Sequence, residues 1–105
     1  MSEVGEFVIT GFVELGDGRL DGLAVAEATP AGDLVPRGVV KFGFAGKGLW
    51  EPLSAIRSGP AGRGGVAPVK PLLSGAFKFF GRYKTSGAIR DGVLLGMPRV
   101  RQGGA

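Results

Sequence analysis

The chain contains no cysteine and no histidine among its 105 residues. Their absence excludes disulfide bonds, thiolate zinc sites, cysteine nucleophiles, histidine-based catalytic triads and imidazole-ligated metals. The sequence also lacks the apolar run of ~18 residues that would span a bilayer, and its first residues lack the basic and apolar segments of a signal peptide. We therefore expect a cytoplasmic protein that binds no cofactor.

Carboxylates are scarce beyond residue 33. Residues 34–105 contain only two acids, Glu51 and Asp91, against twelve bases, a net charge of +10. The first 33 residues hold the other seven acids and one base, Arg19, a net charge of −6, so the whole chain carries +4. A basic excess of this size is expected of a protein that contacts phosphates. Because Glu51 and Asp91 are isolated, the sequence offers no carboxylate pair for acid–base catalysis.

Glycine, in contrast, is abundant. The chain has 21 glycines, about three times the usual frequency, together with seven prolines. This composition disfavours long helices and favours a β domain with many tight corners. The hydrophobic fraction of 44% is typical of a folded protein with one modest core. We expect a single domain over residues 1–97, followed by a basic, flexible tail over residues 98–105.

Alternating β-branched and aromatic residues, separated by Gly, Asp and Pro turns, predict five strands. They span residues 6–15, 20–29, 34–44, 69–83 and 87–95. Between the third and fourth, Leu49, Leu53 and Ile56 recur at helical spacing, which predicts a short helix. Pro52 fits only the first turn of that helix, so the helix begins near Trp50.

Five strands with one helix between the third and the fourth is the order of the OB-fold, a five-stranded Greek-key barrel. This all-β architecture gives the many glycines a use, because they let the strands coil tightly. Trp50 is then expected to plug one end of the barrel. An SH3-like barrel is the competing all-β architecture, but it has no natural place for the helix.

The segment around residues 77–84 combines aromatic and basic side chains, as in platforms that stack nucleobases. Strand alternation divides it: Phe77, Phe79 and Tyr83 share one face, whereas Lys78, Phe80 and Arg82 share the other. The first set is expected in the core. Phe80 points to the same side as Lys78 and Arg82, so it is the candidate for an aromatic side chain that faces a ligand.

Several bases of the later strands would line one groove if those strands are neighbours. They are Arg37, Lys41, Lys47, Lys70, Lys78, Arg82, Lys84 and Arg90. The alternative is that they are ordinary solvated surface charges. The scarcity of acids among them favours the groove, since ordinary protein surfaces mix charges of both signs.

Two short motifs resemble nucleotide-binding signatures and fail. Residues 43–48 (GFAGKG) invite comparison with a P-loop. That pattern requires Gly at position 41, where Lys41 stands, and Ser or Thr at position 48, where Gly48 stands. This loop remains a candidate for backbone contacts to a phosphate. Residues 19–22 (RLDG) resemble the K-x-D-G signature of covalent nucleotidyltransferases, but Arg19 replaces the lysine nucleophile and cannot attack a phosphorus atom. We interpret this segment as a turn.

Three stretches together resemble one known family. They are residues 6–12 (EFVITGF), residues 40–43 (VKFG) and residues 69–71 (VKP), the last followed by a long strand and residues 91–94 (DGVL). In order and spacing they are similar to the C-terminal OB domain of bacterial ATP-dependent DNA ligases of the non-homologous end-joining, ligase D type. The resemblance covers nearly the whole chain. It implies an OB-fold that closes over nicked DNA and contacts its backbone.

The chain departs from that family where the chemistry lies. The lysine nucleophile and the metal-binding acids of the family's adenylation domain have no counterpart in these residues. The closing R-x-D-K motif should fall near residues 95–99, which read LGMPR. The resemblance therefore implies that the chain is not an enzyme on its own, but an accessory part of such a ligase remains an alternative.

We therefore expect a non-catalytic OB-fold module of DNA repair that holds duplex or nicked DNA by its phosphates. The expected contacts are Lys41, Lys47, Lys70, Lys78, Phe80, Arg82 and Lys84. One alternative is a trans-acting subunit of a split ligase, whose partner is a separate adenylation domain or an end-joining protein. A third is a protein-interaction barrel that binds no nucleic acid.

Overall fold

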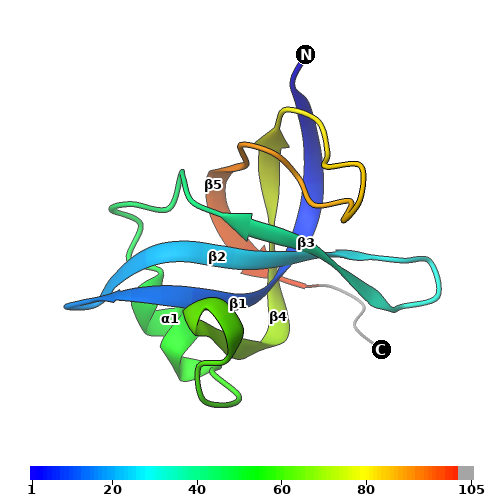
Figure 1. Ribbon diagram of the computed structural model, residues 1–105. Helices are drawn as coiled ribbons and strands as arrows, with labels where there is room; N and C mark the ends of the chain where they lie inside the picture. Colours follow the sequence, from blue (N-terminus) through cyan, green and yellow to red (C-terminus); the bar gives the residue numbers. More distant parts are fainter. Residues whose placement is uncertain (102–105) are drawn as a thin grey trace.

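The structure is a computed structural model, and it describes residues 1–101. Five antiparallel strands form one sheet in the order β3-β2-β1-β4-β5 (Figure 1). The strands are β1 (Glu3–Gly16), β2 (Arg19–Ala28), β3 (Leu34–Val40), β4 (Val66–Phe79) and β5 (Val93–Val100). A helix, α1 (Trp50–Ala55), and a 3₁₀ turn, η1 (Arg63–Gly65), lie between β3 and β4.

The sheet closes on itself between the segment after β3 and the start of β5. Phe42 pairs with Val93 in a parallel bridge, and the Leu94 amide donates to the Phe42 carbonyl at 3.0 Å. Further back along the chain, the Ile89 amide donates to the Arg37 carbonyl, also at 3.0 Å. The result is an OB-like all-β barrel with its helix between the third and fourth strands, which confirms the predicted fold class.

The third and fourth strands end earlier than the sequence predicts. β3 ends at Val40 rather than at residue 44, because Gly43 has a φ of 94° that breaks the extended backbone. β4 ends at Phe79 rather than at residue 83, because Gly81, with a φ of 86°, turns the chain. In consequence Tyr83 lies in a loop with 56% of its surface exposed, and its expected place on the core face is wrong.

The last strand begins later than predicted. Residues 87–91 were expected to be a strand, but Gly87 and Asp91 have φ values of 73° and 51°. This segment therefore pairs only through the bridge from Ile89 to Arg82 and bends at residues 90–91. β5 instead runs over Val93–Val100 and pairs Arg99 with Ser74 of β4. The tail expected from residue 98 therefore begins inside a strand, and its residues 102–105 lie outside the described residues.

The core follows the alternation of the strands. Phe7 packs edge-to-face against Phe77 and Phe79, with ring centroids 5.9 Å and 5.6 Å apart. Both of the latter are buried, as predicted. The other large, fully buried side chains are Ile9, Phe12, Leu23, Val25, Val40, Leu53 and Leu94. Burying side chains of this size stabilises the fold by about 1.5–3 kcal/mol each.

The helix α1 covers one end of the barrel (Figure 1). Leu53 is its only buried residue, and it joins Leu49 and Phe44 in the core cluster. Trp50 packs partly buried against this cluster, and its indole N–H donates to the Glu14 carboxylate of β1 at 2.6 Å. The plug at this end is therefore shared, with Leu53 inside and Trp50 at the rim.

Replacing Gly43 by alanine is expected to destabilise the fold more than the same change at Gly46. Both glycines have positive φ, so each alanine costs roughly 1–2 kcal/mol in backbone strain. At Gly43 the added methyl would also overlap the backbone of Leu94, whereas at Gly46 nothing lies within 4 Å. Urea denaturation of both variants measures the difference; equal losses would contradict a role for Gly43 in closing the barrel.

Candidate nucleic-acid interface

One row of residues crosses the outside of the barrel from β1 to the segment after β3. Val4 pairs with Lys78, Lys78 with Val93, and Val93 with Phe42. Because Phe77, Phe79 and Leu94 point into the core, their neighbours Lys78 and Val93 point outward. The four side chains of this row therefore share one outer surface.

Two further residues extend this surface. The Lys78 ammonium lies 5.6 Å from the centre of the Phe80 ring, so Phe80 continues the row beyond the end of β4. Lys47 reaches across from the loop before α1 and donates to the Gly96 carbonyl of β5 at 2.6 Å. We call the surface formed by Phe42, Lys47, Lys78, Phe80 and Val93 the β4–β5 face.

The aromatic rings of this face are open to solvent. Phe42 is 63% exposed and Phe80 is 43% exposed, so the outward orientation of Phe80 is confirmed. Lys41, also exposed, directly precedes Phe42. Sequence reasoning did not select Phe42, because its direction is set by the bridge to Val93, a contact between distant parts of the chain. Its signal was an aromatic residue beside a lysine in the segment VKFG.

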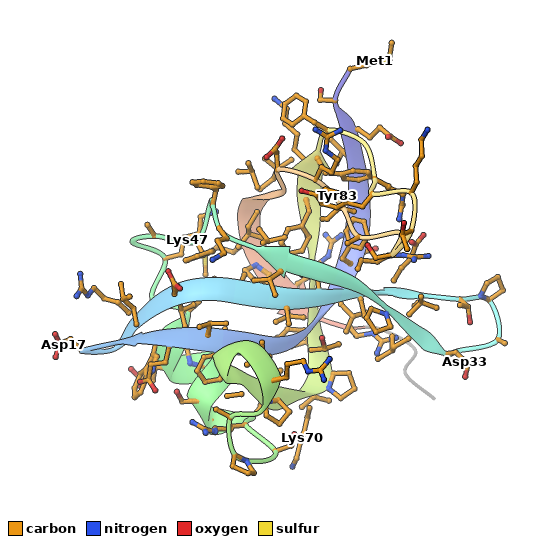
Figure 2. All side chains as sticks on the ribbon, viewed as in Figure 1. Met1, Asp17, Asp33, Lys47, Lys70 and Tyr83 are labelled. Carbon is orange, nitrogen blue, oxygen red and sulfur yellow. The ribbon has the colours of Figure 1, made fainter. Side chains whose placement is uncertain are left out.

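Lys70 lies away from the other expected contacts. Pro68 of β4 pairs with Gly11 of β1, and Leu73 of β4 pairs with Ile9. The four residues between them on β4, 69–72, therefore bulge out of the pairing. Lys70 sits in this bulge, its amide bound to the Ile56 carbonyl at 2.8 Å. Eight residues separate it from Lys78, about 26 Å along an extended strand. Figure 2 shows Lys70 at the lower end of the molecule and Tyr83 in its upper half. Lys70 is therefore set apart from Lys78.

Arg82 is held by internal contacts. Its guanidinium lies 3.2 Å from the Glu27 carboxylate of β2, and its centre lies 5.2 Å from the Phe79 ring. Arg37 of β3 binds the same Glu27 oxygen at 2.9 Å. Together these contacts tie the loop of residues 80–92 to β2 and β3. Arg82 thus has a structural role, whereas Lys84 is exposed on this loop.

The charge separation seen along the sequence is interleaved in the fold. Glu27 from the acidic segment pairs with Arg37 and Arg82, and Glu6 pairs with Arg99 of β5 at 3.3 Å. These ion pairs are partly or largely exposed, so they add little to stability. Their effect is to neutralise arginines, while the described part of the chain shows no ion pair to Lys47 or Lys78.

A hollow lies at the helix end of the barrel. It measures about 440 Å³ and lies between the β1–β2 turn and the glycine-rich loop of residues 43–48, with Trp50 in its wall.

Within residues 1–101, no three His, Cys, Asp or Glu side chains gather in a way that would hold a metal ion. No helix of that part is long and apolar enough to cross a membrane.

The comparisons with known proteins concern the fold. No family model and no curated protein matches the chain. The ligase domain of LigD from M. tuberculosis is similar over 93% of this chain and 35% of that chain, with a TM-score of 0.75 and 23% identity. A mycobacterial DNA ligase D complexed with ATP and MES is similar over 95% and 35%, with a TM-score of 0.70 and 22% identity. The chain therefore has the fold of part of a LigD ligase domain and spans about a third of its length.

Acidification is expected to weaken the anchor of the 80–92 loop. The hydrogen bond from Arg37 holds the pKa of Glu27 below its ordinary value of 4.5; burial opposes the shift and the charge of Arg82 adds to it. Because the folded pKa is depressed, this stabilisation is present above the unfolded pKa and is lost as the pH falls through the folded pKa. The melting temperature of the wild type should therefore fall as the pH is lowered, and that of Glu27→Gln should fall less over the same pH range.

The matched control for that measurement is Glu3→Gln, which removes an exposed carboxylate of β1 without an ion pair in the described residues. Its melting temperature should fall at low pH as much as that of the wild type. A fall in Glu27→Gln as large as that of the wild type would show that the Glu27 contacts contribute nothing to the acid dependence of stability.

Proposed function

We propose that this chain is a non-catalytic DNA-binding module, equivalent to the C-terminal OB domain of LigD-type ligases, and that it holds duplex or nicked DNA by the phosphate backbone. The observation that carries this proposal is the β4–β5 face, where Lys47 and Lys78 flank β5, while Glu6 of β1 and Glu27 of β2 pair with arginines. The fold similarity to LigD ligase domains supports it.

The phosphate contacts in this proposal are narrower than the set expected from the sequence. Lys41, Lys47, Lys78 and Lys84 are lysines on or near the β4–β5 face or its adjoining loop, and lysine binds phosphate as a flexible point charge. Arg82 is engaged by Glu27, and Lys70 lies at the distant end of β4. Such contacts position the DNA without reading its sequence, so the proposed binding is non-specific.

Binding should depend steeply on salt. Four neutralised phosphates give a slope of log K against log salt of about −3.6, which means a loss of roughly 100-fold between 50 and 200 mM salt. Fluorescence polarisation of a labelled nicked duplex measures both quantities. The absence of any binding at about 50 mM salt would contradict the proposal.

A pair of matched variants locates the contacts. Lys78→Gln should reduce the magnitude of the salt slope by about 1, because one phosphate contact is lost. Lys70→Gln makes the same chemical change at the other end of β4 and should leave the slope unchanged. Equal effects of the two variants would count against the β4–β5 face, even if the chain binds DNA.

A second candidate function is that of a trans-acting part of a split ligase. The observation that favours it is the fold similarity to LigD ligase domains, of which this chain spans about a third. Added to a separate adenylation domain, the chain should raise the rate of nick sealing, and Lys78→Gln should weaken that gain. A sealing rate that does not change on addition would exclude this candidate.

A further inference from the structure

We propose that Phe42 and Phe80 stack unpaired nucleobases, so that the β4–β5 face prefers DNA with a short single-stranded stretch, as at a gap or an overhanging end, over continuous duplex. This inference rests on the proposed function and names its substrate class. It starts from two exposed aromatic rings on one face, with a lysine beside one of them.

Neither ring is needed by the core. Phe42 and Phe80 are absent from the buried cluster, which contains five other phenylalanines. Large apolar side chains are usually buried, so two exposed rings on one surface indicate a binding site. Their surroundings are partly apolar as well, since Val4, Leu95 and Met97 are also exposed on β1 and β5. The face thus offers flat apolar surfaces to a ligand.

The spacing of the rings suits a short single strand. Across the sheet, Phe42 lies two strands away from Lys78, with Val93 between them. Phe80 lies two residues after Lys78 along the chain. At ordinary sheet spacings the Cα atoms of Phe42 and Phe80 are therefore about 12 Å apart. Bases stacked along one strand rise about 3.4 Å each, so the two rings can contact bases about three steps apart. The Lys78 ammonium lies 5.6 Å from the centre of the Phe80 ring, on the same surface as the phosphates that would link these bases.

Charge favours a nucleic acid over an apolar protein surface as the occupant. Lys78 is half-buried beside Phe80, Lys41 precedes Phe42, and Lys47 reaches β5. Three acids lie near this face. Glu3 pairs with Phe79, so by strand alternation it points to the opposite side of β1 from Val4. Glu6 is bound by Ser74 and Arg99, and Asp91 precedes β5. In continuous duplex the faces of the bases are covered by their neighbours, so only unpaired bases can stack on the rings.

The test compares blunt duplex with the same duplex carrying a ten-nucleotide single-stranded overhang, by fluorescence polarisation at one salt concentration. Base–aromatic stacking of the strength measured in other proteins implies at least about a fivefold tighter binding for each stacked base. The wild-type chain should prefer the overhang accordingly. Phe42→Ala and Phe80→Ala should each reduce that preference while changing blunt-duplex affinity less than about twofold.

Two controls separate stacking from other effects. Phe80→Leu keeps an apolar side chain but removes the ring, so it should also reduce the preference. Leu72→Ala removes an exposed apolar residue in the β4 bulge beside Lys70 and should leave both affinities unchanged. Both phenylalanines are exposed, so thermal melting temperatures of their variants should stay close to that of the wild type.

The outcomes are distinguishable. Equal affinity of the wild type for blunt and overhanging DNA would overturn the stacking inference and leave the proposed function standing. Phe80→Ala weakening both DNAs equally, or instead abolishing binding to a separate adenylation domain, would also overturn it. Failure to bind either DNA would overturn the proposed function and this inference with it.

Discussion

The barrel depends on the short parallel pairing between Phe42 and Val93. Without it the five strands would form an open sheet with β3 and β5 as edges, and the core side chains beneath them would meet water. The pairing needs Gly43, whose left-handed backbone sits directly against the Leu94 backbone. The same contact turns Phe42 outward beside Val93. Closing the core and forming the β4–β5 face are therefore one structural event.

The distribution of charge acquires its meaning only in the fold. Along the chain, acids precede residue 34 and bases follow it, but antiparallel pairing brings β1 and β2 between the basic strands. Arginines are the bases that meet these acids: Arg37 and Arg82 share Glu27, and Arg99 contacts Glu6. In the described residues, Lys47 and Lys78 of the β4–β5 face form no ion pair. The positive field of the β4–β5 face thus comes from flexible point charges, which suits contact with a phosphate backbone of any sequence.

Much of the fold could be predicted from the sequence because it is encoded by short-range patterns. Alternation identified the strands and placed Phe77 and Phe79 inside with Phe80 outside, and the spacing of Leu49 and Leu53 identified the helix. The position of the last strand was missed. Residues 87–91 contain apolar residues compatible with a strand, but the Asp91-Gly92 pair is a local turn signal, and Asp91 does adopt a left-handed conformation.

The candidate site was harder to predict, since its composition depends on contacts between distant residues. Strand parity alone does not show that Phe42 faces outward, because the bridge to β5 sets its direction. It also cannot show that Lys70 lies in a bulge, or that the Arg82 guanidinium lies over the Phe79 ring. The resemblance to ligase OB domains indicated a DNA-facing role, but it matched only Lys41 and Lys70 among the expected contacts.

The central claim is that DNA lies on the β4–β5 face, and NMR titration of the labelled chain with a nicked duplex at low salt tests it most directly. The account predicts amide shift changes concentrated at residues 41–43, 78–80 and 93–96, which reverse on adding salt. Shift changes centred instead on Lys70 and Arg57, at the other end of β4, would contradict it. So would spectra that do not change at all.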